Sequence, residues 1–140
     1  MTEKFKILGN YIRDLSSETP DIETYLYVKD YISKYQLNID ITSKPLKNKM
    51  IEVSTALKFE DKTESKKKSY FEIIFVTIIK INEEITEKNE LEKIILCDVQ
   101  TKIYPDLEKS FLNMLHDSGY PNVKFEKKID FENLYMQRFN

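Results

Sequence analysis

Apolar side chains occupy both faces of one predicted strand, residues 70–81. Side chains in a strand alternate between its two faces, and here both alternating sets are apolar. One set is Phe71, Ile73, Phe75, Ile79 and Ile81, and the other is Tyr70, Ile74, Val76 and Ile78. One set can form the core, whereas the other needs a layer of the same protein, another subunit or an apolar ligand. A central strand between two layers is the simplest interpretation.

Two further segments alternate apolar and polar residues and are predicted to be half-buried strands. They cover residues 33–42 and 50–59, and a polar loop at 60–69 leads from the second to the two-sided strand. A first extended segment spans about residues 5–15, with Gly9 where a bulge would be tolerated. The sequence therefore predicts four strands in its first 81 residues.

After residue 82 the apolar spacing becomes helical. Positions 91–99 predict one helix, and Pro105 is expected to separate it from a second helix over 105–117, capped by Gly119. Asp130 is a candidate N-cap for a short last helix. Its apolar face would comprise Phe131, Leu134, Tyr135 and Phe139. Strands followed by helices on one sheet face predict a single α+β domain over residues 1–140.

Composition excludes several classes of protein. The 140 residues are 41% hydrophobic, and 22 basic against 24 acidic side chains argue against a nucleic-acid surface held by bulk positive charge. No apolar run approaches the length of a membrane span, and the N-terminus lacks a signal-peptide pattern. The single cysteine, Cys97, fits a reducing compartment. We therefore expect a cytoplasmic protein.

Candidate catalytic residues are few. The chain has one histidine, His116, and one thiol, Cys97, on different predicted helices. A Cys-His pair is conceivable in space, but a buried structural cysteine and a histidine at a helix C-terminus explain both residues more simply. The sequence has neither a histidine–cysteine metal set nor a glycine-rich phosphate loop. We predict a protein that is not an enzyme and needs no cofactor.

The segment between the first two predicted strands is more apolar than a loop requires. Residues 20–33 are rich in tyrosine, which offers a large apolar area together with a hydroxyl that tolerates water. Such a segment suits a binding surface for varied partners. A short amphipathic helix packed on the sheet is the alternative.

Several motifs, in order, resemble the SecB family of protein-export chaperones. Tyr11 to Pro20 is similar to the family's first-strand motif, and Lys29 to Tyr31 leads into the second strand. Tyr104-Pro105 and Tyr120-Pro121 resemble its two aromatic-proline pairs, and Ile129 to Met136 resembles its closing segment. The resemblance spans roughly residues 7–139, nearly the whole chain.

This resemblance implies a four-stranded antiparallel sheet with C-terminal helices on one face, paired into dimers and again into a homotetramer. It implies an ATP-independent holding chaperone that binds unfolded preproteins in apolar grooves and keeps them competent for export. Many shallow sites would bind weakly and together gain avidity. The candidate client-binding residues are Tyr25, Leu26, Tyr27, Tyr31 and Leu37.

The family's second partner is the export motor ATPase SecA, whose basic, zinc-bearing tail meets an acidic patch on the sheet. Asp14, Glu18 and Glu72 match those acidic positions. Such docking should weaken with salt. Ordinary surface acids are the alternative reading of these three residues.

The chain departs from the family pattern in three places. Ser17 replaces an aromatic residue, residues 74–77 replace a polar, glycine-containing stretch, and the acidic C-terminal tail is missing. The chain could therefore serve a dedicated client, as SecB-like chaperones that guard an antitoxin do. A purely structural oligomer and an enzyme with an activated Cys97 thiol are the remaining alternatives.

Overall fold

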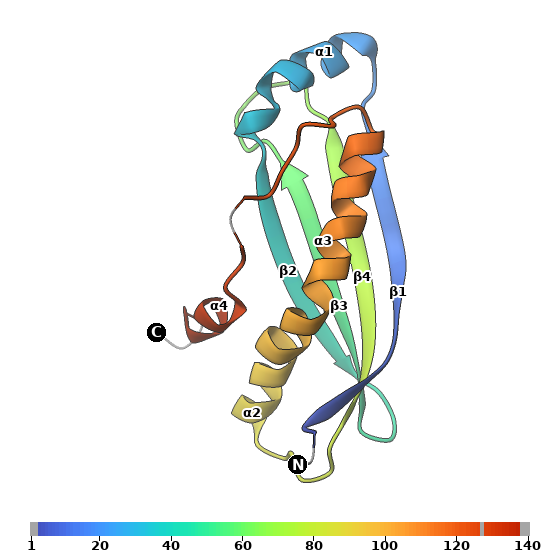
Figure 1. The fold of residues 1–140 in the computed structure, drawn as a ribbon, viewed down its shortest axis with the longest axis vertical. Coiled ribbons are helices and arrows are strands. Elements are labelled where there is room, and N and C mark those ends of the chain that lie inside the picture. The colour runs from blue at the N-terminus through green and yellow to red at the C-terminus, as the bar shows by residue number, and fades with distance from the viewer. Residues whose placement is uncertain (1–2, 127, 138–140) are drawn as a thin grey trace.

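A four-stranded antiparallel sheet forms the body of the protein (Figure 1). The computed structural model describes residues 3–126 and 128–137. The strands follow one another across the sheet in the order β1-β4-β3-β2, so that β1 and β2 form its two edges. Their bounds are β1 Phe5–Glu18, β2 Gln36–Pro45, β3 Met50–Glu60 and β4 Tyr70–Ile81. The predicted α+β sheet is confirmed.

Strand β1 is irregular in two places. Its register against β4 shifts between Ile7 and Gly9 and again between Ile12 and Asp14. The first shift confirms the predicted irregularity at Gly9. An extra residue on one strand bends that strand and increases its twist. The strand then continues to Glu18, beyond the predicted end near residue 15.

The tyrosine-rich segment forms helix α1, Ile22–Tyr31. Asp21 is its N-cap, because its Oδ1 accepts a hydrogen bond from the Thr24 backbone N–H at 2.7 Å. A short 3₁₀ turn, Ile32–Lys34, then delays the start of β2. The strand predicted from residue 33 therefore begins only at Gln36, and Tyr35 lies just before it as a buried residue.

One continuous helical run covers residues 88–117. It consists of α2 (Lys88–Lys93), a π-helical turn (Ile94–Asp98) and α3 (Val99–Asp117). The predicted break at Pro105 is wrong, since this proline lies inside α3. Proline removes the hydrogen bond to the carbonyl four residues earlier, which here belongs to the exposed Thr101, where water can replace the lost donor.

The end of α3 follows the sequence prediction. Ser118 is its C-cap, and Gly119 has a φ of +108°, a conformation that favours glycine. The chain then returns past β2 to helix α4, Phe131–Gln137, capped by Asp130 through the Asn133 backbone N–H. Phe139, which the apolar pattern assigned to this helix, lies outside the described residues.

The core lies between α3 and one face of the sheet (Figure 1). Residues of β3 and β4 on that face are fully buried, as are residues along one side of α3. The principal members are Val53, Leu57, Phe71, Ile73 and Ile79 from the sheet, with Ile103, Leu107, Phe111 and Leu115 from the helix. Across the described residues, no helix has both the length and the apolar character needed to cross a membrane.

Only one face of β4 is covered by helices, so the interpretation of a strand between two layers is half right. On the other face Tyr70 is exposed, yet Val76 is completely buried. The Arg13 guanidinium of β1 donates to Glu52 of β3 at 2.9 Å, and this ion pair passes over β4 because β4 lies between those strands. Side chains of the sheet itself therefore replace part of the missing layer.

Candidate functional site: an apolar groove along strand β2

The C-terminal segment and the edge strand β2 border a groove. After α3, the chain runs from residue 119 alongside β2 to α4, which lies beyond this edge of the sheet (Figure 1). The space between the segment and the strand is divided into two cavities that follow β2 from its beginning toward its middle. We call these two cavities together the β2 groove.

The larger cavity of the β2 groove lies at the start of the strand and measures about 750 Å³. Leu37 of β2 and Phe59 of β3 form one wall, and Val123, Phe125 and Ile129 of the returning segment form the other. The Phe59 and Phe125 rings meet edge to face, with centroids 5.5 Å apart. Ring packing thus holds the apolar part of the walls, while Gln36, Lys124 and Glu126 also line the cavity.

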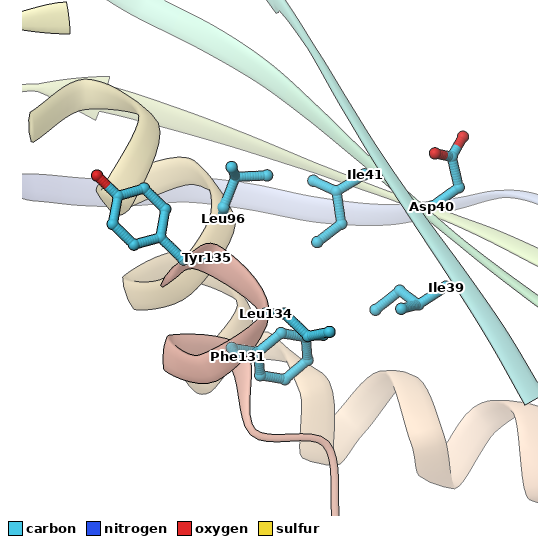
Figure 2. Close-up of a pocket in the computed structure, with 7 residues that line it drawn as sticks. All are labelled: Ile39, Asp40, Ile41, Leu96, Phe131, Leu134 and Tyr135. Atoms are coloured by element: carbon cyan, nitrogen blue, oxygen red, sulfur yellow. The ribbon is translucent and has the colours of Figure 1, made fainter. Parts of the chain in front are cut away.

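The smaller cavity, about 220 Å³, lies farther along β2 against α4 (Figure 2). Ile39 and Ile41 project into it from the strand, while the carboxylate of Asp40 lies on the opposite side of the strand. Because Leu37, Ile39 and Ile41 are alternate residues of one strand, they line a single continuous wall. The opposite wall consists of Leu96, Phe131, Leu134 and Tyr135.

The π-helical turn places Leu96 in this smaller cavity. Ile94, Ile95, Cys97 and Val99 around it are buried, whereas Leu96 is partly exposed and lines the groove. A π turn inserts one residue into a helix and changes the direction of neighbouring side chains. The irregularity therefore gives the groove an apolar residue from a helix that otherwise packs on the core.

Hydroxyl groups anchor the upper end of the groove. Thr19, Ser69 and Tyr120 are linked by mutual hydrogen bonds of 2.7 to 3.2 Å. Tyr35 joins them by accepting from the Ser69 backbone N–H, and burial raises the pKa of its phenol. These bonds tie β1, β4 and the segment after α3 to the start of β2.

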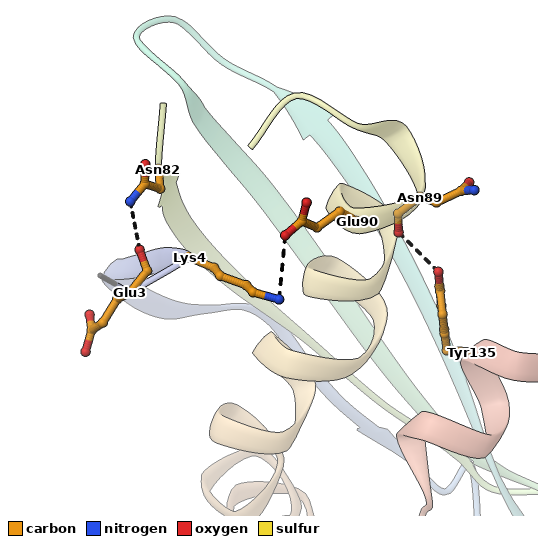
Figure 3. A network of polar contacts seen from close by, with 6 residues as sticks. All are labelled: Glu3, Lys4, Asn82, Asn89, Glu90 and Tyr135. Carbon is orange, nitrogen blue, oxygen red and sulfur yellow. Dashed lines mark hydrogen bonds and ion pairs between the residues drawn. The ribbon is translucent and has the colours of Figure 1, made fainter. Parts of the chain in front are cut away.

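The lower end is tied to α2. Tyr135 of α4 donates its hydroxyl to the carbonyl oxygen of Asn89 at 3.1 Å (Figure 3). One residue further along α2, Glu90 forms an ion pair with Lys4 at 3.6 Å. Helix α4 is thereby held to α2, beyond the β2 edge of the sheet.

The five predicted client-binding residues lie in four places. Leu37 lines the β2 groove, and Tyr25 lines a cavity of about 190 Å³ that shares Ile32 and Val123 with it. Leu26 is 53% exposed on the outer side of α1. Tyr27 and Tyr31 pack on each other with ring centroids 4.6 Å apart. At 100° per residue, Tyr25 and Tyr27 lie on different sides of the helix.

Sequence reasoning missed most of the groove. Ile39 and Ile41 were recognised as the inward face of a strand, and Phe131 and Leu134 as a helix face, but neither pair was assigned to a site. No local pattern shows that the C-terminal segment returns beside β2. Ile22, which is 70% exposed on α1, was also missed.

The three predicted acidic residues share the helix-free face. Asp14 and Glu18 flank Ser16, whose cross-strand partner is Glu72. Glu72 accepts a 2.6 Å hydrogen bond from Tyr70 and lies 3.8 Å from the Lys58 ammonium group. The bond to Glu72 raises the pKa of Tyr70 to about 12. The structure thus brings the three carboxylates close together, with Glu72 already partly engaged.

Cys97 and His116 do not form a catalytic pair. They are 19 positions apart along the continuous helical run, or roughly 28 Å at 1.5 Å per residue. The His116 Nε2 atom hydrogen-bonds the Val123 carbonyl, and burial raises the pKa of the Cys97 thiol. Within residues 3–126 and 128–137, no group of three histidine, cysteine, aspartate or glutamate residues is placed to hold a metal ion.

An edge strand beside an open apolar groove is an arrangement by which polypeptide-binding α+β proteins take up an extended chain. Comparison with known families gives the more specific assignment. The family model described as "Preprotein translocase subunit SecB" matches residues 1–140. The chain belongs to the SecB family of protein-export chaperones.

Individual relatives agree with this assignment. A SecB protein-export protein of Pelagibacter ubique is 62% identical over 140 residues, covering 100% of both chains. The protein-export protein SecB of Rhodospirillum rubrum is 23% identical over 132 residues, 94% of this chain and 80% of the relative. Among solved structures, the SecB-like chaperone of Mycobacterium tuberculosis, in complex with a ChAD peptide from the HigA1 antitoxin, has a TM-score of 0.62 at 10% identity. That match covers 89% of this chain and 91% of the solved one.

Proposed function

We propose that the protein holds non-native polypeptides in the β2 groove without nucleotide hydrolysis and keeps preproteins competent for export. The observation that carries this proposal is the continuous apolar wall of Leu37, Ile39 and Ile41 opposite the returning C-terminal segment. The proposal places the chaperone in the cytoplasm, where preproteins are met before export and an unpaired Cys97 stays reduced.

The geometry supports binding of an extended segment. Strand β2 is at the edge of the sheet, so its outer backbone groups are available to pair with another strand. Apolar side chains of the client would enter the two cavities, each burying area worth about 25 cal/mol per Å². This binding depends on apolar character rather than on a particular sequence.

The residues on α1 would extend the contact beyond the groove. We assign Leu37 and Tyr25 to the groove and its upper end, and Leu26, Tyr27 and Tyr31 to an outer surface that a longer client reaches. Several weak contacts along one chain raise its overall affinity. Loss of the outer contacts should therefore weaken long clients more than short peptides.

The test is suppression of aggregation of a slowly refolding preprotein, without nucleotide. The groove variant Leu37→Ser/Leu134→Ser should lose most of this activity. Met136→Ser is the matched control, because Met136 is 54% exposed on the same helix and does not line the groove. Size and urea stability are measured for each variant. Equal activity of the groove variant and the control would refute the proposal.

We propose further that the acidic cluster docks the basic tail of SecA. Asp14, Glu18 and Glu72 lie on the face opposite the helices, so a partner there would leave the groove open. Binding of a zinc-loaded SecA tail peptide should weaken about five- to tenfold in Asp14→Asn/Glu18→Gln at 50 mM salt and differ little at 300 mM. Glu64→Gln, at an exposed position of the 61–69 loop, is the control. An unchanged affinity would argue for ordinary surface acids.

A dedicated client is the second candidate function. It is favoured by the fold likeness to the SecB-like chaperone that was solved with an antitoxin peptide. Deletion of the gene should leave secreted precursors unprocessed if the role is general export. If the role is dedicated, one neighbouring antitoxin should disappear while precursor processing continues.

Assembly into an oligomer is proposed through β1. Leu8, Ile12 and Leu15 on this edge strand are 43 to 48% exposed, an unusual density of large apolar residues for a free edge. Pairing with a second copy would cover them, and a dimer of dimers would follow from a second contact. If the protein is only a structural oligomer, the groove variant should assemble normally and the parent should suppress no aggregation.

A further inference from the structure

A cavity of about 600 Å³ lies between the long helical run and the stretch that leads into α4. Residues on one side of the run, from Cys97 to Glu108, form one wall, and residues 128–132 form the other. Among the described residues that line it, none belongs to the sheet, whereas strand β2 forms a wall of the β2 groove. We call this space the α3 cavity. Its volume is within the range of small-molecule sites, about 300 to 1,000 Å³.

The charged side chains around the α3 cavity are mainly acidic. Glu108 on α3 and Asp130 and Glu132 at the start of α4 line it, against one cation, Lys128. One oxygen of Asp130 already accepts the Asn133 backbone N–H as the N-cap of α4. Three carboxylates against one ammonium group leave an excess of negative charge. The cavity therefore favours a ligand with positive charge.

This negative charge acts on groups in the wall of the cavity. Burial raises the pKa of the Tyr104 phenol, and the Glu108 carboxylate raises it further. Burial also raises the pKa of the Cys97 thiol, with further contributions from the carboxylates of Asp98 and Glu132. Carboxylates from both walls thus act on the same space, and they disfavour any additional negative charge there.

The Tyr104-Pro105 pair leaves this wall short of hydrogen-bond donors. Tyr104 is only 8% exposed, and its hydroxyl has no hydrogen-bond partner among the described residues. Pro105 has no N–H, so the Thr101 carbonyl four residues earlier lacks its usual helical donor. Buried polar groups are normally paired. A hydroxyl oxygen and a carbonyl oxygen can both accept from the N–H groups of a ligand.

The carboxylates are not arranged for a metal ion, and part of the cavity is apolar. Within residues 3–126 and 128–137, no group of three histidine, cysteine, aspartate or glutamate residues is placed to hold a metal. The Tyr104 and Phe131 rings pack edge to face with centroids 5.3 Å apart, and both line the cavity with Ile129. Aromatic rings attract organic cations as well as apolar groups.

We propose that the α3 cavity binds a small organic cation, an amine or guanidine carried on an apolar body. The cationic group donates to Glu108 and Glu132 on the two walls, and the Tyr104 hydroxyl is a further acceptor. The body of the ligand lies against the Phe131 ring. This site is separate from the holding of polypeptides, although Phe131 also lines the β2 groove. A basic side chain of a bound polypeptide carries the same chemistry, and the test distinguishes the two sources.

Tryptamine, an indole ring with a primary ammonium group, is the probe. Tryptophol, in which a hydroxyl replaces the ammonium group, is its neutral counterpart. Because the chain has no tryptophan, the fluorescence anisotropy of the indole reports binding directly. Tryptamine should bind about five- to tenfold more tightly than tryptophol at 50 mM salt. This ratio should decrease at 300 mM salt.

Three variants of the full chain test the assigned contacts. Glu108→Gln and Glu132→Gln should each weaken tryptamine binding about three- to tenfold and leave tryptophol binding unchanged. Asp106→Asn is the matched control, because Asp106 is exposed on α3 and does not line the cavity. Tyr104→Phe should weaken tryptamine binding about two- to fivefold. Its urea midpoint should equal or exceed that of the parent, since a buried hydroxyl without a partner does not stabilise the fold.

The β2 groove provides the control for the source of the cation. Leu37→Ser, which alters the groove alone, should bind tryptamine like the parent, and an excess of unfolded preprotein should leave the probe bound. Displacement by the preprotein would assign the site to basic side chains of the polypeptide and overturn the small-molecule proposal. Equal affinities for tryptamine and tryptophol, or unchanged tryptamine binding in both glutamine variants, would also overturn it.

Discussion

A buried pair of polar side chains joins helix α3 to the sheet and allows a quantitative prediction. The Thr55 hydroxyl of β3 donates to the Gln100 Oε1 atom at 3.2 Å, and the Gln100 Nε2 atom donates to Thr55 Oγ1 at 2.9 Å. Both residues are completely buried. Each side chain is therefore the other's partner in a place that water does not reach.

Removing one partner should destabilise the protein more than removing both. Thr55→Val leaves a buried amide without its partner and should lower the free energy of unfolding by about 2 to 3 kcal/mol. Gln100→Leu leaves a smaller hydroxyl unpaired and should lower it by about 1 to 2 kcal/mol. The double variant replaces both groups by apolar ones and should lie within about 1 kcal/mol of the parent. The coupling energy is then about 3 kcal/mol.

The assay is urea unfolding of the parent, the two single variants and the double variant, followed by circular dichroism. Thr77→Val is the matched control, because Thr77 is also completely buried and its hydroxyl has no hydrogen-bond partner among the described residues. This substitution should be neutral or should stabilise by up to about 1 kcal/mol. Single effects that add to within about 0.5 kcal/mol in the double variant would refute the reasoning.

Three further predictions concern the segments around the core and the groove. Gly119→Ala should lower the urea midpoint of unfolding, because Gly119 has a φ of +108° and an added Cβ would lie 2.7 Å from the Tyr25 ring. Adding Tyr25→Ala to this variant removes the close contact and should recover part of the loss. Hydrogen bonds from the side chain and backbone of Thr24 lower the pKa of Asp21, so the Asp21 carboxylate stabilises the fold above its unfolded-state pKa of about 4, and this contribution is lost as the pH falls through the lower folded-state pKa. The urea midpoint of Asp21→Asn should therefore change less between pH 5 and pH 3 than that of the parent. Leu107→Ala should lower the free energy of unfolding by about 2 to 5 kcal/mol in the same assay, because Leu107 is completely buried, and a loss below 1 kcal/mol would contradict its place in the core.

The strands could be predicted because their faces differ in polarity. Residues 50–59 alternate with few exceptions, and the structure buries the apolar members of the inward side, Ile51, Val53, Leu57 and Phe59. The boundary of β2 could not be found in this way. Tyr35 continues the alternation of β2 but is buried by packing against Phe59 and Phe71 from outside the strand, so periodicity alone assigned it to the wrong element.

Pro105 shows where a local rule gives the wrong result. The proline was expected to begin a helix because an interior proline loses a hydrogen bond and crowds the preceding turn. In the structure, the buried side of α3 includes Ile103 and Tyr104 before the proline and Leu107 after it. Burial of these side chains against the sheet outweighs one local penalty, and that balance depends on tertiary packing.

The candidate site was predicted only in part, for a related reason. Leu37, predicted as a client-binding residue, lines the groove, but its opposite wall comes from Val123 and Phe125, about 85 positions later in the chain. Apolar spacing reports which side of an element faces the interior, and it does not report which elements meet. The tyrosines of α1 were conspicuous in the sequence, yet Tyr27 and Tyr31 pack on each other, and neither lines the two cavities of the β2 groove.

Strand β2 separates the two proposed binding surfaces by its alternation. Ile39 and Ile41 face the groove, whereas Asp40 and Thr42 belong to the helix-free face of the sheet, on which the proposed acidic docking cluster lies. Substitutions at even positions of β2 should therefore leave aggregation suppression intact, and substitutions at the odd positions that line the groove should weaken it. If Asp40→Lys abolished suppression, or Leu37→Ser weakened binding of the zinc-loaded tail peptide, the two surfaces would not be separate and the register argument would fail for both.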